Sequence, residues 1–174
     1  LFLLSLCFGR KNKLSALTGQ KFAQALMNIG NQVKIILDDS GSILEVAKST
    51  VHNENFLYLG RGLNFPVALE GALKLKEISY IHAEAYPAGE LKPGPRALVD
   101  EKMPVVAVAP NDVLIEKLKS NLEEVRARGG RLFLFADPGS GFVESDDVRI
   151  LQVAPVDSAI APIIYTVPLQ LLSY

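Results

Sequence analysis

Apolar residues in the first third of the chain recur every three or four positions, which is the period of an amphipathic helix. Over residues 15–39 they form one helical series that Gly30 interrupts, so a kink or a break between two helices is predicted there. A further short helix is predicted over residues 43–51, with Ser40 or Ser42 as its N-cap. The apolar members of the long series are Phe22, Leu26, Ile29, Val33 and Ile36.

After residue 55 the pattern changes to short, continuously apolar runs, which are predicted as strands separated by helices. The apolar runs are 56–59, 105–108 and 132–135, a further strand is predicted over 148–153, and the helices are 66–80, 113–128 and 159–174. Strands that are apolar throughout are typical of a parallel sheet buried on both faces. The predicted fold is therefore α/β, a doubly wound parallel sheet flanked by helices in a flavodoxin-like three-layer sandwich.

In such a sheet, ligands bind outside the carboxyl ends of the strands. The segments expected at that edge are Gly60–Phe65, Ala83–Val99 and the turn at Pro110. Residues 84–99 form the longest segment predicted to be irregular, and long ordered loops in compact domains are often functional.

Composition excludes several classes of protein. The 174 residues are 49% hydrophobic, which fits one globular domain, and a net charge of −1 without a basic block argues against a nucleic-acid partner. Cys7 is the only cysteine, which excludes an internal disulfide and a cysteine-based zinc site, so no metal is expected.

The two ends of the chain are apolar but do not resemble membrane segments. Residues 1–8 and 160–174 are both shorter than the roughly 18 apolar residues of a membrane span, and the first run lacks the features of a signal peptide. Apolar helices at both ends favour a piece of a longer cytoplasmic chain, and no membrane partner is expected.

The sequence Gly60-Arg61-Gly62 follows a predicted strand and invites comparison with a dinucleotide-binding turn. The third glycine of that motif would fall at Phe65, which makes nucleotide binding the weaker interpretation. The glycines are better explained by a tight turn into the next helix.

A charged stripe is predicted on the helix that follows this turn. Glu70, Lys74 and Glu77 are spaced i, i+4, i+7 and therefore share a stripe about 60° wide. Leu73 and Ile78 flank them, so the stripe is interpreted either as the partly buried wall of a cleft or as an ordinary ladder of surface salt bridges. A carboxylate fixed by a lysine suits proton abstraction next to a carbonyl.

The two histidines are the other candidates for acid–base chemistry. His52 precedes the first predicted strand and is interpreted as a surface residue, whereas His82 lies between a helix end and a loop and is more simply structural.

Long stretches of the chain resemble one known family. Leu59–Gly62, Ala68–Tyr86 and Ala88–Lys92 closely resemble the second sugar isomerase (SIS) domain of the glutamine:fructose-6-phosphate aminotransferases, and the resemblance continues through Met103–Val106, Glu124–Gly130 and Ala161–Leu172. It covers nearly the whole chain and is weakest before Phe56. By this resemblance residues 1–52 are leading helices and a linker, and residues 53–174 are the SIS domain.

The resemblance implies a function and site residues. The family makes glucosamine 6-phosphate from fructose 6-phosphate and glutamine, using a glutaminase domain and two SIS domains without cofactor or metal. Glu77 corresponds to the carboxylate that moves a proton between the first two sugar carbons, and Lys74 and Glu70 correspond to charged residues lining the sugar site.

The sequence departs from the family pattern in ways that bear on activity. Pro93 stands where the family has a ring-opening histidine, and proline has no titratable group. The turn Ala109–Asp112 lacks the hydroxyl groups of a phosphate-binding loop, which the family carries in its first SIS domain. Tyr174 stands before the tail that holds the family's Schiff-base lysine.

We therefore expect an isomerase-domain portion of this transaminase that is inactive alone. Its expected partners are fructose 6-phosphate, the first SIS domain, the glutaminase domain and a second copy of the chain in a homodimer. The alternative is a non-catalytic SIS module that binds a sugar phosphate or mediates dimerisation.

Overall fold

The structure, a computed structural model, describes residues 1–91 and 99–174. Within them, five parallel strands form one sheet in the order β2-β1-β3-β4-β5. The strands are β1 (Asn55–Gly60), β2 (His82–Pro87), β3 (Pro104–Ala109), β4 (Arg131–Ala136) and β5 (Val148–Gln152). Because the order reverses between β1 and β3, the doubly wound α/β fold predicted from the sequence is confirmed.

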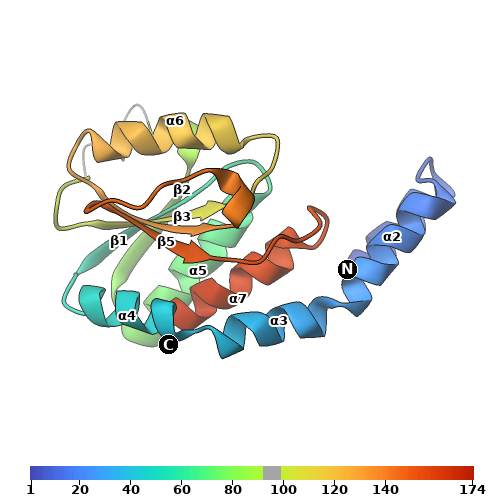
Figure 1. Cartoon of the computed structure of the whole chain (residues 1–174), viewed down its shortest axis with the longest axis horizontal. Coiled ribbons are helices and arrows are strands. Elements are labelled where there is room, and N and C mark those ends of the chain that lie inside the picture. Colours follow the sequence, from blue (N-terminus) through green and yellow to red (C-terminus); the bar gives the residue numbers. More distant parts are fainter. Residues whose placement is uncertain (92–98) are drawn as a thin grey trace.

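Helices cover both faces of this sheet (Figure 1). They are α1 (Phe2–Lys11), α2 (Ala16–Met27), α3 (Ile29–Asp38), α4 (Gly41–Thr50), α5 (Asn64–Ser79), α6 (Ile115–Arg126) and α7 (Ala161–Ser173), with short 3-10 turns η1 (Ala88–Glu90) and η3 (Pro138–Ser140). Helix α6 lies on one face, and α4, α5 and α7 lie on the other (Figure 1). The result is the predicted three-layer sandwich.

Each face of the sheet has its own hydrophobic core. Alternate residues of β1 point to opposite faces, so Tyr58 packs with α4, α5 and α7, whereas Leu57 and Leu59 pack with α6. Helix α5 approaches Tyr58 and α7 closely because residue 71 is a glycine: a Cβ there would lie 2.8 Å from Leu169 Cδ1 and 2.9 Å from Tyr58 Cε1. This contact fixes the depth at which α5 rests on the sheet.

The break in the first helical series occurs earlier than predicted. Helix α2 ends at Met27 and α3 begins at Ile29, so the chain changes direction at Asn28, and Gly30 lies within the first turn of α3. The prediction of a break at Gly30 was therefore wrong in position. Asn28 accepts a hydrogen bond on Oδ1 from Asn31 Nδ2 at 2.8 Å, which links the side chain at the break to the first turn of α3.

Strand β2 was missed in the sequence, where residues 84–99 were interpreted as irregular. It pairs with β1 in parallel register, with His82 opposite Asn55 and Pro87 opposite Gly60. Since β2 forms an edge of the sheet, only Ala83 in it is fully buried and its other side chains are partly or fully exposed. Strand β2 therefore lacks the continuous apolar run by which the interior strands were recognised.

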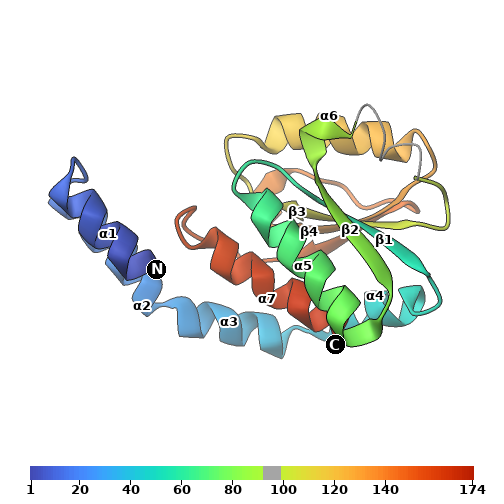
Figure 2. The ribbon, with the colours of Figure 1, turned by 180° about the vertical axis from the view of Figure 1, so that it is seen from behind.

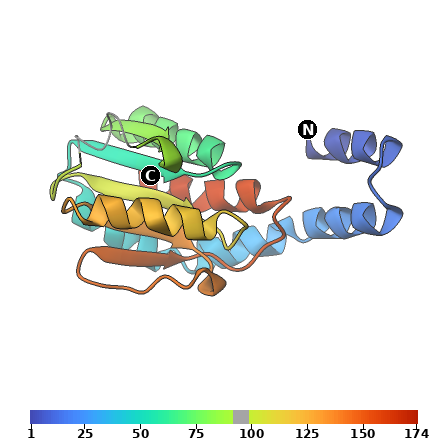
Figure 3. The same ribbon diagram turned by 90° about the horizontal axis from the view of Figure 1, so that it is seen from above.

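The first two helices project from the sandwich. Helices α1 and α2 pack against each other, and α3 connects them to α7 (Figures 2 and 3). Several large apolar side chains on this arm are exposed, among them Leu3, Leu4, Phe8 and Leu17. Among the described residues, no helix has both the length and the apolar character needed to cross a membrane.

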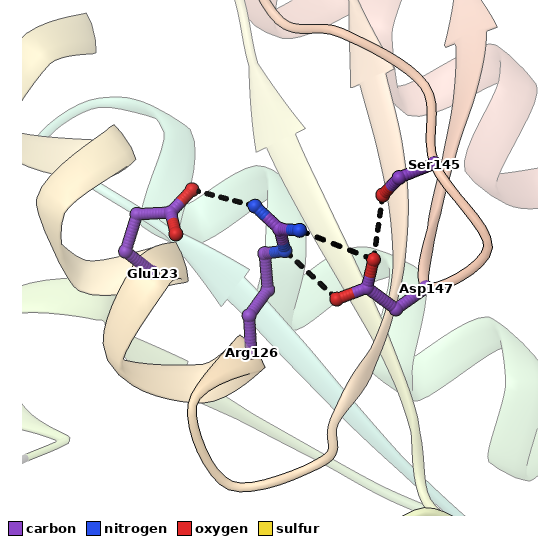
Figure 4. A network of polar contacts seen from close by, with 4 residues as sticks. All are labelled: Glu123, Arg126, Ser145 and Asp147. Carbon is purple, nitrogen blue, oxygen red and sulfur yellow. Dashed lines mark hydrogen bonds and ion pairs between the residues drawn. The ribbon is translucent and has the colours of Figure 1, made fainter.

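A polar network fastens the end of α6 to the turn before β5 (Figure 4). Arg126 donates from Nε to Asp147 Oδ2 at 2.8 Å and from Nη2 to Asp147 Oδ1 at 3.2 Å, while Nη1 donates to Glu123 Oε1 at 2.9 Å. Ser145 Oγ donates to Asp147 Oδ1 at 2.5 Å. Hydrogen bonds from Arg126 and Ser145 lower the pKa of Asp147 to about 2, so the carboxylate stays ionised.

Candidate functional site

The structure brings the three predicted stripe residues together on α5. Lys74 Nζ lies 2.6 Å from Glu77 Oε2 and 3.8 Å from Glu70 Oε1. The shorter contact is a charge-assisted hydrogen bond, and the longer one is an ion pair without hydrogen-bond geometry. Lys74 is therefore held principally by Glu77, and Glu70 adds negative charge on the other side.

Within this chain the stripe lies on an open helix face. The side chains of Glu70, Lys74 and Glu77 are 36%, 29% and 52% exposed. The neighbouring apolar side chains Leu73 and Ile78 are also exposed, at 42% and 45%. The described residues thus supply one side of a site, and a second surface is needed to make this face the wall of a cleft.

The two carboxylates of the stripe keep Lys74 positively charged. The hydrogen bond to Glu77 raises the pKa of Lys74 above its ordinary value, and the charges of Glu77 and Glu70 add to this effect. Lys74 is therefore an ammonium at neutral pH. A cation 2.6 Å from one oxygen of Glu77 orients the carboxylate and leaves its other oxygen available to receive a proton.

The histidines have separate surroundings. His82 Nδ1 lies 3.1 Å from Asn55 Oδ1, and its Nε2 lies 3.5 Å from Glu84 Oε1. Tyr86 donates from its hydroxyl to Glu84 Oε2 at 2.5 Å, which lowers the pKa of Glu84. His82 thus belongs to a polar group on the edge strand, and His52 is exposed between α4 and β1.

The turn after β1 has the geometry expected of a tight entry into α5. A Cβ on Gly60 would lie 2.2 Å from the carbonyl oxygen of Asn64, and Gly62 has a φ of 57°. Both positions therefore require glycine for backbone reasons.

Two further points of the sequence prediction concern the ring-opening position and metal binding. Pro93, the residue at the family's ring-opening position, lies outside the described residues. Within residues 1–91 and 99–174, no group of three or more His, Cys, Asp or Glu side chains could hold a metal ion.

The acidic and aromatic side chains at the carboxyl edge of the sheet were not predicted from the sequence as site residues. Asp112 and Asp137 follow β3 and β4, and both line a cavity there together with Tyr165. Their position directly after apolar runs was the available signal, because the carboxyl ends of parallel strands share one edge. Tyr165 had no local signal, since it lies within an apolar helix.

Comparisons with known proteins agree with the fold. A family model described as "SIS domain" matches residues 51–174. The glutamine–fructose-6-phosphate aminotransferase [isomerizing] of Escherichia coli K12 is 52% identical over 174 residues, which are the whole of this chain and 29% of that protein. The enzyme of the same name from Idiomarina loihiensis is 51% identical over 174 residues and is covered over 28% of its length.

Solved structures extend the comparison. The C-terminal domain of glucosamine-fructose-6-phosphate aminotransferase from Francisella tularensis has a TM-score of 0.94 and 48% identity, covering 98% of this chain and 48% of that one. A putative phosphosugar isomerase from Silicibacter pomeroyi has a TM-score of 0.70 and 26% identity, covering 92% and 47%. The chain spans less than a third of the length of the two curated relatives.

Proposed function

This chain belongs to the SIS domain family, and on that premise we propose that it forms part of the isomerase region of an aminotransferase that makes glucosamine 6-phosphate from fructose 6-phosphate and glutamine. The observation that carries the proposal is the identity of 52% with the E. coli aminotransferase over every residue of this chain. Such similarity across a whole domain is far more specific than a short motif.

Glu77 is the proton-transfer base in this proposal. Its carboxylate removes a proton from the first carbon of the open sugar. The electrons of that C–H bond form a double bond to the second carbon, while the electrons of the double bond between the second carbon and its oxygen or nitrogen move onto that heteroatom, which takes up a proton. The proton is then returned from Glu77 to the second carbon as the hydroxyl of the first carbon loses its proton and becomes the carbonyl oxygen. The Lys74 ammonium, 2.6 Å from Glu77 Oε2, holds the carboxylate in place before it accepts the proton.

Lys74 and Glu70 line the sugar site beside the base. The ammonium of Lys74 can donate to sugar oxygens with the hydrogens that Glu77 does not use, and Glu70 can accept from sugar hydroxyls. Because the stripe is open in this chain, the proposal requires other surfaces to close over it. The exposed apolar side chains Leu69 and Leu73, at 45% and 42%, offer contact area beside the charges for such a surface.

The closing surfaces are proposed to be the first SIS domain, the glutaminase domain and a second copy of the chain in a homodimer, acting in the cytoplasm. The turn Ala109–Asp112 offers no hydroxyl to a phosphate, so the phosphate site belongs to another part of the enzyme. The chain alone is therefore inactive in this proposal.

The experiment is a chimera in which residues 1–174 replace the matching segment of the E. coli aminotransferase. Glu77→Gln removes the base while keeping the shape of the side chain, and it should lower glucosamine 6-phosphate formation by about 10²- to 10⁴-fold. Glu116→Gln is the matched control: it makes the same chemical change on α6, across the sheet, at an exposed residue. It should leave the rate unchanged.

The alternative function gives the opposite result. A non-catalytic sugar-phosphate-binding or dimerisation module predicts that Glu77→Gln and Glu116→Gln turn over equally fast. Folding of both chimeras is verified by their thermal unfolding, which should agree closely because single exposed ion pairs contribute little to stability.

A further inference from the structure

A large cavity opens at the carboxyl edge of the sheet, apart from the stripe on α5. It measures about 850 Å³ and lies where the segments after β1 and β3 diverge. Its lining residues are Gly62, Leu63, Asn64, Pro110, Asn111, Asp112, Val113, Leu114, Asp137, Val156, Ser158, Ala161, Pro162 and Tyr165. This volume is in the range of cavities that hold small molecules.

Much of the lining is apolar, and two of the apolar side chains are unusually exposed. Leu63 is 74% exposed and Val113 is 97% exposed, although both are large hydrophobic residues. They come from the turns before α5 and α6, which bound the cavity. A ligand with an apolar part would remove this surface from water.

The charged groups of the lining are carboxylates. Asp112 accepts from the Leu114 backbone N–H at 2.7 Å and from Asn64 Nδ2 at 2.9 Å. Asp137 accepts from the backbone N–H of Asn111 at 2.8 Å and from that of Gly139 at 2.7 Å. Each oxygen retains a lone pair for a further donor.

The sign of this charge selects against phosphate. Of the described residues that line the cavity, none is lysine, arginine or histidine. The starts of α5 and α7 also line the cavity and would by themselves favour an anion, but the two carboxylates offset their partial positive charges. A phosphate group would therefore meet like charge, whereas hydroxyl or ammonium groups would find acceptors.

Tyr165 supplies an independent polar feature. Its side chain is buried, and among the described residues no acceptor for its hydroxyl proton is found. Burial raises the pKa of Tyr165, the charges of Asp137 and Asp112 raise it further, and an interaction with the Asp137 backbone lowers it in part. Tyr165 lines the same cavity as both aspartates. A buried hydroxyl proton without an acceptor is costly, so this group is suited to donate to a ligand oxygen.

We propose that this cavity binds an unphosphorylated sugar or amino sugar that carries an apolar substituent, with Asp112 and Asp137 accepting from its hydroxyl or ammonium groups and Tyr165 donating to one of its oxygens. The site is separate from Glu70, Lys74 and Glu77 and does not depend on their role. It would therefore hold a ligand different from the sugar phosphate of the proposed reaction.

The test is a titration of the 174-residue chain, followed by NMR of its backbone amides, with matched probes. The probes are phenyl β-D-glucopyranoside, its 2-amino-2-deoxy analogue and phenyl β-D-glucopyranoside 6-phosphate. The first two should shift amides in segments 111–114 and 158–165. The phosphorylated probe should bind at least about tenfold more weakly because of like-charge repulsion.

Two variants localise the binding. Ser158→Trp fills the cavity from an exposed lining position and should abolish binding without unfolding the chain. Tyr165→Phe removes only the hydroxyl and should weaken binding about three- to tenfold, while the thermal unfolding temperature stays equal or rises. The proposal is overturned if neither unphosphorylated probe binds, if the phosphorylated probe binds as well or better, or if binding is unaffected by both variants.

Discussion

Replacing Gly71 by alanine tests whether the close approach of α5 to the sheet is as tight as the structure indicates. The new Cβ would lie 2.8 Å from Leu169 Cδ1 and 2.9 Å from Tyr58 Cε1, and both of those side chains are fully buried. Overpacking of this kind costs about 1–3 kcal/mol. Alanine regains about 1 kcal/mol of helix propensity over glycine. The net expectation is a loss of about 0–2 kcal/mol in the free energy of unfolding.

The control for this prediction is Gly30→Ala. Gly30 also lies within a helix, but a Cβ there meets nothing within 4 Å, so only the gain in propensity remains. In urea unfolding, the free energy of unfolding of Gly30→Ala should be higher than that of the parent chain, and that of Gly71→Ala should be equal to or lower than it. The two variants should differ by about 1–3 kcal/mol in this free energy. If both substitutions stabilise the chain equally, the contact among α5, α7 and β1 is looser than described.

Two predictions concern pH. Hydrogen bonds from Arg126 and Ser145 lower the pKa of Asp147 to about 2. Asp147 therefore contributes fully to stability when the pH is above the ordinary pKa of an aspartate, and this contribution is lost as the pH falls through about 2. Asp147→Asn should therefore lower the urea midpoint at pH 7, and a difference from the parent chain that stays constant down to pH 2 would contradict this. Burial raises the pKa of Tyr58 and Tyr165 in the folded chain above the ordinary tyrosine pKa. The two buried neutral hydroxyls therefore do not destabilise the folded state below that ordinary pKa, whereas above it the unfolded chain ionises more readily and the folded state loses stability. Above about pH 10 stability should fall with rising pH, and the double variant Tyr58→Phe, Tyr165→Phe should flatten that dependence; an unchanged slope in spectrophotometric and urea titrations would refute the assignment.

The interior of the fold could be predicted from the sequence because its signals are local. Strands β3 and β4 consist almost wholly of apolar residues, and helix α6 between them has one apolar face. Strand β2 escaped detection because it carries the polar residues His82 and Glu84 and only one buried residue, and its identity as a strand depends on hydrogen bonds to β1, which are long-range.

The candidate site was predictable only in part, for a similar reason. Helical spacing alone brought Glu70, Lys74 and Glu77 to one face, and the contacts of Lys74 with both carboxylates confirm that they are neighbours. Whether that face is open or enclosed depends on what packs against it, which spacing along one helix does not encode. The cavity at the carboxyl edge likewise depends on segments from four parts of the chain.

Helix α5 takes part in both regions. Its first residue, Asn64, lines the cavity, and the stripe extends to Glu77, about 20 Å further along the same helix axis. A ligand in the cavity therefore contacts the same rigid element that carries the ammonium and carboxylates of the stripe. If such a ligand changes the affinity of the stripe for a sugar, reciprocity requires that a molecule bound at the stripe change the affinity of the cavity by the same factor.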